Sequence, residues 1–286
     1  MIQKINYFFT RVFDVILYPF GFINEFWGIL FLSILMSFVV LVIYKYISSP
    51  RMIKETKNQI KANILAIRLY KDFGKIIISS FFKSVFYTFK YFFLNFGPVL
   101  LIIPILFPAF VQMDVRYGMR PYQVGEEIVI KTEFSRNPNE LEVQLLENGN
   151  FKPKMNPVFI NAYKVYNNNG DKEGPIKEVN WKTEATQEGI AKIEIKVNDK
   201  VFEKSLVIGD FRGALSNKKY KDSSFSHFIY PAEGLLPEAD TLDNIYIQYP
   251  GENVSFAGIR THWLVFNIIL VVIIVLAFRK KFGVEF

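Results

Sequence analysis

The residues of this sequence that could do chemistry are few, and the most suggestive are polar side chains inside or at the ends of apolar stretches. These residues are Ser33, Ser37, Asn95, Gln112 and Asn267. Ser33 and Ser37 are one helical turn apart, so a helix places them on one side. Polar groups in such places either line a groove between membrane helices or hydrogen-bond one packed helix to another, which is the more common use. The sequence therefore offers a candidate groove, with helix packing as the alternative.

A second candidate set is a basic stripe in the segment that follows the first apolar stretch. The stripe consists of Lys54, Lys57, Lys61 and Arg68, spaced along one face of a helix. Basic residues beside a membrane commonly set its topology and touch anionic lipid. The functional alternative is contact with an acidic partner, such as ribosomal RNA or a nascent chain.

Signals for catalysis or metal binding are missing. The absence of cysteine excludes disulfides, thiolate catalysis and cysteine-based metal sites. His227 and His262 stand in no zinc motif, and no nucleophile elbow, P-loop or acidic calcium loop is present. One group of carboxylates has the spacing of solvated strand faces: Glu126, Glu127, Glu140 and Glu142. We therefore expect no enzyme, no cofactor and no metal.

Long apolar stretches must position these residues. They cover 26–47, 96–111 and 263–278. A hydrocarbon core about 30 Å thick needs roughly 20 residues of helix to cross it. The first stretch has that length, and the other two are slightly short but carry no charge. We predict an integral membrane protein with transmembrane helices at 26–47, 95–113 and 262–278.

Charge sets the predicted orientation. Between Tyr44 and Asn95 the chain has ten basic residues against two acidic ones, whereas 114–261 has 19 basic and 22 acidic residues. Basic loops stay in the cytoplasm. We therefore expect the segment 48–94 and the tail 279–286 inside and residues 114–258 outside. The basicity is then topogenic and predicts no sequence-specific binding of nucleic acid.

The segments beside the first span read as amphipathic helices. Residues 1–22 carry apolar side chains at helical spacing, and Pro19 and Gly21 end the pattern, which predicts a helix lying in the membrane interface. Residues 48–94 predict a cytoplasmic hairpin of two helices turning at Gly74. We expect its apolar faces to bury each other and to meet the membrane surface, and we expect a break at Asn95–Pro98 before the second span.

Residues 114–258 change to the alternating pattern of β-strands. Strands are predicted over 127–134, 141–146, 157–166, 179–183, 191–197 and 201–208, with weaker candidates at 220–230 and 244–249. Turn signals separate them, including the segment 168–171. Short strands of this number around an inward tryptophan, Trp181, favour an immunoglobulin-like β-sandwich. The expected fold is thus three membrane helices with an amphipathic helix and a helical hairpin, plus an extracytoplasmic sandwich.

This order of elements resembles the core of the Oxa/YidC insertase superfamily, closest to its minimal three-span branch. Segments 60–72 (IKANILAIRLYKD), 112–118 (QMDVRYG) and 282–285 (FGVE) look like those of a bacterial group that carries an extra β domain between spans two and three. The resemblance covers residues 1–120 and 260–286. The chain departs from the bacterial pattern by having three spans instead of five and no arginine within a predicted span.

The resemblance implies a bacterial inner-membrane protein that assists insertion or folding of membrane proteins. A cytoplasm-facing polar groove would receive the client, and the basic hairpin would capture it. Expected partners are the bilayer and nascent membrane proteins or the ribosome. The alternative is a membrane-anchored binding protein whose outside sandwich engages an envelope protein. An anchor alone would need one span and no hairpin, which favours the first interpretation.

Overall fold

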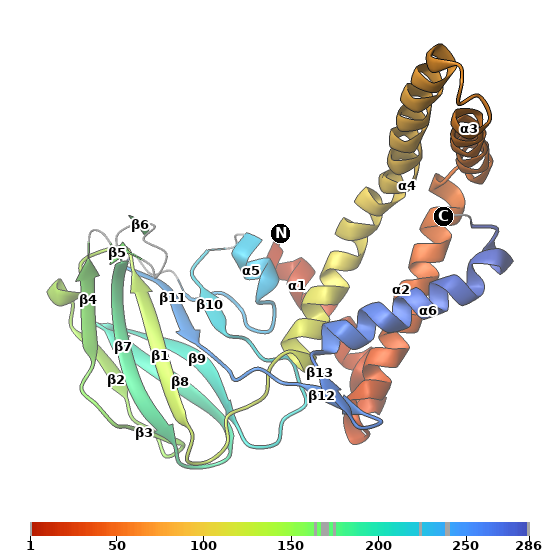
Figure 1. Ribbon diagram of the computed structural model, residues 1–286. Helices are drawn as coiled ribbons and strands as arrows, with labels where there is room; N and C mark the ends of the chain where they lie inside the picture. The colour runs from red at the N-terminus through yellow and green to blue at the C-terminus, as the bar shows by residue number, and fades with distance from the viewer. Residues whose placement is uncertain are drawn as a thin grey trace. The chain divides into compact units, whose positions relative to one another are not determined.

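The computed structural model describes residues 2–162, 165–166, 172–173, 176–222, 225–237 and 241–284. The chain forms two compact units (Figure 1). The β unit contains Met1–Glu25 and Phe110–Trp263, and the helical unit contains Phe26–Ala109 and Leu264–Phe286. The turn predicted at 168–171 lies outside the described residues.

The helical unit is built from long helices. They are α2 (Glu25–Ile47), α3 (Pro50–Leu69), α4 (Gly74–Tyr117, whose last turns belong to the β unit) and α6 (Trp263–Phe282). Within the described residues, α2, α4 and α6 are long and apolar enough to cross a membrane. The three apolar helices predicted from the sequence are therefore confirmed.

Helix α4 is continuous, so the predicted break at Asn95–Pro98 is wrong. The helix runs from Gly74 to Tyr117 through Pro98, Pro104 and Pro108. Proline removes a backbone donor, and a membrane helix tolerates the loss where neighbouring groups satisfy the carbonyls. Near Pro98 the hydroxyl of Tyr44 donates to the carbonyl of Asn95 at 3.2 Å. The hairpin and the second apolar stretch are thus one element.

The expected mutual burial of the hairpin faces is also wrong for α4. Helix α3 buries Ile53 and Thr56, but the phenylalanine-rich face of α4 is exposed. The ammonium of Lys57 lies 5.3 Å from the ring centre of Tyr91. At 3.6 residues per turn, Tyr91 is on the opposite side of α4 from Phe82 and Phe89. The side of α4 that faces Lys57 is therefore the side that carries Tyr91. Phe82 and Phe89 point away from α3.

The β unit has two antiparallel sheets. The larger has the order β10-β11-β1-β7-β3, with β4 also paired to β7, and the smaller has the order β2-β8-β9. The larger sheet is formed by β1 (Glu127–Phe134), β3 (Phe151–Pro153), β4 (Val158–Ala162), β7 (Ile176–Ala185), β10 (Lys218–Tyr220) and β11 (Leu242–Ile247). The smaller sheet is formed by β2 (Val143–Leu146), β8 (Gly189–Val197) and β9 (Lys200–Ile208).

Short elements complete the β unit. They are η2 (Pro138–Glu140), the pair β5 (Val165–Tyr166) and β6 (Lys172–Glu173), the pair β12 (Val254–Phe256) and β13 (Ile259–Thr261), and α5 (Phe225–Ile229). The main predicted strands are confirmed with small shifts of their ends. The candidate at 220–230 is wrong, because β10 ends at Tyr220 and the chain then forms α5.

One apolar core fills the space between the sheets. Side chains alternate along β8, so that Ile193 and Ile195 are buried while their neighbours face outward. Trp181 of β7 lies in the same core, as the sequence predicted. A core shared by two layers is the standard way for half-apolar sheets to bury their inner faces.

Helix α1 (Ile2–Leu17) and the short helix η1 (Tyr18–Phe22) also belong to the β unit. The predicted helix and its end near Pro19 are confirmed. Asn6 donates to the carbonyl of His227 in α5 at 2.8 Å, and Phe13 and Leu17 are buried. The guanidinium of Arg212 donates to the carbonyls of Gly21 and Ile23 at 3.0 and 2.8 Å. One side of α1 is therefore docked, while Phe8 and Val15 stay exposed.

A buried ion pair ties β9 to the loop after α5. The side chain of Lys204 is 0% exposed and that of Glu233 is 12% exposed, and their charged atoms are 2.7 Å apart. Lys204 also donates to the carbonyl of Ser216 at 2.8 Å. Burial lowers the pKa of the Lys204 ammonium, and Glu233 opposes that shift. Removing only the carboxylate would leave a buried charge without its counter-charge.

We expect Glu233→Gln to lower the free energy of unfolding by about 3 kcal/mol, because breaking a buried pair strands the remaining ion. This loss of unfolding free energy should shrink as the pH rises toward about 10.4, the pKa of lysine in an unfolded chain. The sign follows because folded Lys204 holds its proton less tightly than the unfolded chain does. Chemical denaturation of the full chain in detergent measures this. Glu203→Gln, on an exposed pair of the same strand, is the control, and an equal midpoint in both variants would contradict the expectation.

Candidate functional site

The predicted groove residues fall into separate places. Ser33, Ser37 and Asn267 come together in the helical unit, where all three are 0% exposed. Asn267 of α6 donates its side-chain amide to the hydroxyl of Ser33 in α2 at 2.9 Å. Ser33 and Ser37 donate back to carbonyls of their own helix, those of Ile29 and Ser33. These residues form a packed polar seam between α2 and α6.

The seam has the character of a helix-packing contact. Close to it, the rings of Phe26 and Phe266 meet edge to face at 5.5 Å. Small polar residues let two helices approach closely and hydrogen-bond where water is absent. A ligand would reach Asn267 only if α2 and α6 moved apart. Asn95 lies elsewhere, with its side chain donating to the carbonyl of Tyr91 in its own helix.

Gln112 belongs to a different cluster, centred on Arg116 in the β unit. The guanidinium of Arg116 forms an ion pair with Asp14 of α1 and donates a hydrogen bond to the side-chain oxygen of Gln112 at 2.6 Å. It also donates to the carbonyl of Thr10 at 3.2 Å, and Gln112 donates to the Thr10 hydroxyl at 3.2 Å. The Arg116 side chain is only 5% exposed. The last turns of α4 are thereby joined to α1.

Sequence reasoning missed Arg116 because it ended the second span at residue 113. Once α4 continues to Tyr117, Arg116 is one turn beyond Gln112 on the same helical face. The spacing of Gln112 and Arg116 was the available signal. Arg116 lies in the last turn of this 44-residue helix, beyond the apolar stretch 96–111 in which the span was predicted.

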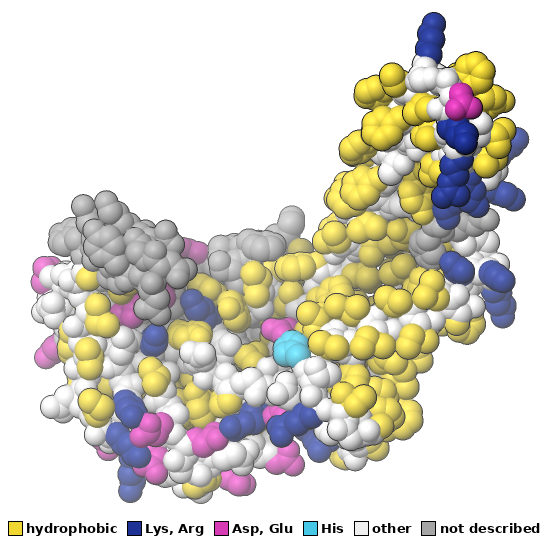
Figure 2. All heavy atoms as spheres, in the orientation of Figure 1, with side chains coloured by type: hydrophobic (Ala, Val, Ile, Leu, Met, Phe, Trp, Pro, Cys, Tyr) yellow, Lys and Arg dark blue, Asp and Glu magenta, His cyan; other side chains and the backbone are white. Residues whose placement is uncertain are grey.

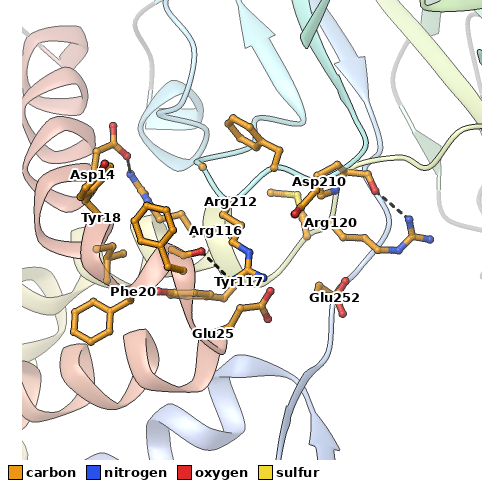
Figure 3. A pocket seen from close by; sticks show the side chains of 17 residues that line it. Asp14, Tyr18, Phe20, Glu25, Arg116, Tyr117, Arg120, Asp210, Arg212 and Glu252 are labelled. Atoms are coloured by element: carbon orange, nitrogen blue, oxygen red, sulfur yellow. Dashed lines mark hydrogen bonds and ion pairs between the residues drawn. The ribbon is translucent and has the colours of Figure 1, made fainter. Parts of the chain in front are cut away.

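Arg116 opens onto a cleft of about 640 Å³ in the β unit (Figure 3). The cleft contains basic and acidic side chains together with aromatic rings. Its charged lining residues are Asp14, Glu25, Asp210, Glu252, Arg116, Arg120 and Arg212. Arg120 forms two hydrogen bonds to Glu126, at 2.7 and 2.9 Å, and holds the pKa of that carboxyl below its usual range. Arg116 and Arg120 are each paired with a carboxylate, Asp14 and Glu126 respectively.

The ionisable side chains in the lining of the cleft are carboxylates, arginines and tyrosines, without histidine or cysteine. Nor does any group of histidine, aspartate and glutamate among the described residues have the arrangement of a metal site. Of the carboxylates singled out from the sequence, Glu126 binds Arg120 and Glu127 pairs with Lys182 and Lys154. The carboxylate of Glu140 accepts a hydrogen bond from the side-chain amide of Asn137. The backbone N–H of Glu142 donates to the side-chain oxygen of Asn198.

The basic stripe of the hairpin lies on α3. Lys54, Lys61 and Arg68 are exposed, and Lys57 is the member that lies over Tyr91. Lysine and arginine side chains gather over this part of the molecule (Figure 2). A hollow of about 450 Å³ in the helical unit joins the start of α3 to the end of α6 and contains Arg51, Lys54 and Lys280. The stripe therefore forms an accessible cationic surface.

The two histidines have different surroundings. His262 is exposed, and its ring lies 5.6 Å from that of Trp263, which is compatible with the predicted interfacial role. His227 is 1% exposed in α5, and burial lowers its pKa. Its carbonyl holds Asn6 of α1.

Comparison of the chain with family models, with curated proteins and with solved structures found no match. The resemblance to the Oxa/YidC superfamily therefore stays a prediction, and function has to be argued from the molecule itself.

The Arg116 cluster generates a prediction about α1. Asp14→Asn removes the counter-charge of a nearly buried guanidinium, and we expect α1 to dock less tightly by about 1–2 kcal/mol, discounted because Asp14 is partly exposed. Hydrogen exchange of the full chain should show amides of α1 exchanging about tenfold faster. Arg11→Gln is the control, because Arg11 has no carboxylate partner among the described residues. Equal exchange in the Asp14 variant and the unaltered chain would contradict the role of the pair.

Proposed function

We propose that this protein assists the insertion or folding of membrane proteins and receives the hydrophobic segment of its client on α4. The observation that carries the proposal is a row of exposed apolar side chains on that helix, here named the α4 stripe. The α4 stripe consists of Ile78, Phe82, Phe86, Phe89, Phe93, Phe96, Leu100 and Ile103, whose exposed fractions lie between 39% and 67%.

The α4 stripe is one surface. Its members recur every three or four residues, which keeps them on one face of a helix. From Ile78 to Ile103 the stripe extends about 38 Å at 1.5 Å per residue. Figure 2 lets the reader follow apolar side chains along this helix from the hairpin onward. Because α4 is unbroken, the stripe passes from the hairpin into the apolar part of the helix without interruption.

A stripe of this kind offers a hydrophobic client a path. Exposed apolar surface of such extent marks a site of interaction with protein or membrane. A client helix that slides along the stripe keeps apolar contact from the membrane surface to the interior, so its side chains are never fully returned to water. Each buried methylene avoids a cost of about 0.8 kcal/mol.

The remaining parts of the proposal follow from charge and from the family resemblance. The hairpin and the C-terminal tail lie in the cytoplasm of a bacterium, the β unit lies outside the inner membrane, and α1 rests in the interface. The basic stripe Lys54, Lys57, Lys61 and Arg68 attracts the acidic flanks of a nascent chain or ribosomal RNA. The seam of Ser33, Ser37 and Asn267 is the place where α2 and α6 would part to open a polar groove.

A second candidate function is an anchored binding protein, in which the β unit has the predicted immunoglobulin-like fold. It is favoured by the polar cleft of about 640 Å³ at Arg116 and Arg212, which is large enough for a small ligand or a peptide side chain. This candidate explains the β unit but gives no role to the α4 stripe. We therefore rank it second.

The two candidates differ in which surface contacts other proteins. We expect a photocrosslinking amino acid at Phe89 of the full chain to capture nascent membrane proteins in translating cells. The same amino acid at Tyr91, on the opposite side of α4, is the matched control and should capture few of them. A third variant, at the exposed Phe159 of β4, reports on the β unit.

The outcome separates the candidates. Capture of hydrophobic clients at Phe89 and few at Tyr91 or Phe159 supports the insertase-like function. If Phe159 captures an envelope protein while Phe89 captures no membrane protein, the proposal fails and the anchored binding protein replaces it.

A further inference from the structure

A second cavity in the β unit, of about 450 Å³, lies between α1 and the segment that follows α5. Most of its lining residues have polar side chains, and they come from two parts of the chain that are far apart in sequence. From α1 it contains Gln3, Lys4, Asn6, Tyr7, Thr10, Arg11 and Asp14, and from the later segment His227, Pro231, Ala232, Glu233 and Gly234. The volume is in the range of sites that hold small ligands.

His227 is a buried polar group in this lining without an evident structural use. The residue is 1% exposed, and its Nε2 finds no hydrogen-bond partner among the described residues. An unmade hydrogen bond of a buried polar atom costs roughly 1–3 kcal/mol. In native proteins, such an atom is often hydrogen-bonded by a ligand or an ordered water molecule. His227 therefore points to an occupant of the cavity.

The charges of the lining indicate which occupant fits. Asp14 is paired with Arg116, and Glu233 is paired with the buried Lys204. Lys4 and Arg11, in contrast, have no carboxylate partner in the described part of the chain. Arg11 instead donates its Nε to the hydroxyl of Tyr7 at 3.2 Å, which leaves the terminal nitrogens of the guanidinium available. The uncompensated charge of the cavity is therefore positive.

The apolar side chains beside these cations indicate where the rest of the ligand lies. Along α1, Lys4, Phe8, Arg11 and Val15 follow one another at spacings of four, three and four residues, so they share one side of the helix. Phe8 is 62% exposed and Val15 is 75% exposed. Cations that alternate with exposed apolar side chains are typical of a helix at the level of lipid headgroups.

We propose that this cavity binds the phosphate of an anionic glycerophospholipid. Lys4 and Arg11 hold the phosphate oxygens, His227 and Gln3 hydrogen-bond the polar headgroup, and the acyl chains lie against Phe8 and Val15. A headgroup with an ammonium is disfavoured, because both carboxylates of the lining are already engaged. The bound lipid joins α1 to the loop at Glu233 from the membrane side.

This site takes from the proposed function only the position of α1 in the interface, and it needs no client. The test therefore uses the purified full chain in a neutral detergent, titrated calorimetrically with monomeric dihexanoyl phosphatidylglycerol. Dihexanoyl phosphatidylcholine and inorganic phosphate are the comparison ligands. We expect saturable binding of phosphatidylglycerol at one site per chain, and binding of the other two at least about tenfold weaker.

Exposed positions allow variants that leave the fold intact. Replacing one cation that hydrogen-bonds a phosphate should weaken binding about tenfold, so K4Q with R11Q should weaken it about a hundredfold. The matched control is R136Q with K152Q, which removes the same charges from exposed positions of the β unit and should bind as the unaltered chain does. His227→Gln should weaken binding in chains whose thermal unfolding stays cooperative.

The results that would overturn the proposal are distinct. Unchanged binding of phosphatidylglycerol by K4Q with R11Q would mean that the cavity is not the site. Equal binding of phosphatidylcholine would contradict selection by charge, and equal binding of inorganic phosphate would assign the site to a free anion instead of a lipid. Loss of client crosslinking at Phe89 would leave this site untouched, since the two experiments share no readout.

Discussion

The rest of this molecule depends on the continuity of α4, because each proline inside a helix removes a backbone donor. Three prolines remove donors from α4, yet the helix runs from Gly74 to Tyr117. The hydroxyl of Tyr44 supports the carbonyl of Asn95 close to the first of these prolines. Because the helix does not break, the α4 stripe is a single apolar surface. For the same reason Gln112 and Arg116 lie on one face and can join α1.

Several buried polar groups in this chain are paired with a second polar side chain. The amide of Asn267 meets the hydroxyl of Ser33, Arg116 meets Asp14, and Lys204 meets Glu233. Each such pair costs desolvation, and loss of one partner leaves the other buried without its counterpart. In the cavity beside α1, by contrast, Lys4 and Arg11 have no carboxylate partner among the described residues, and the Nε2 of His227 has no hydrogen-bond partner there.

Much of the fold could be predicted from the sequence, because its signals are local. Three apolar stretches gave the three long apolar helices, and alternation gave the strands β1, β7, β8 and β9. The errors came where tertiary contacts decide. Proline at position 98 locally predicts a break, yet α4 continues through it, and Tyr44 of α2 donates to the carbonyl of Asn95 in the same turn. The residues after Tyr220 have strand-like composition but form α5, whose carbonyl at His227 binds α1.

The candidate site was predicted less well than the fold. Ser33, Ser37 and Asn267 do come together. Polar side chains inside apolar helices pack against one another because they can then hydrogen-bond across the helix contact. Arg116 and the cavity at His227 could not be found in the same way. Each depends on residues about 100 to 220 positions apart, such as Asp14 with Arg116 or Asn6 with His227, and no local pattern encodes that distance.

The proposed function requires that the α4 stripe guide a client into the bilayer. The most direct measurement is insertion of a newly synthesised hydrophobic protein into vesicles that contain the purified chain, scored by protection from protease. Serine replaces Phe82, Phe89 and Phe93 in one variant and, as the control, the exposed Ile64, Leu65 and Leu69 of α3 in another. We expect insertion to fall to the level of empty vesicles for the first variant and to persist for the second. Equal insertion by the first variant and the unaltered chain would contradict this expectation.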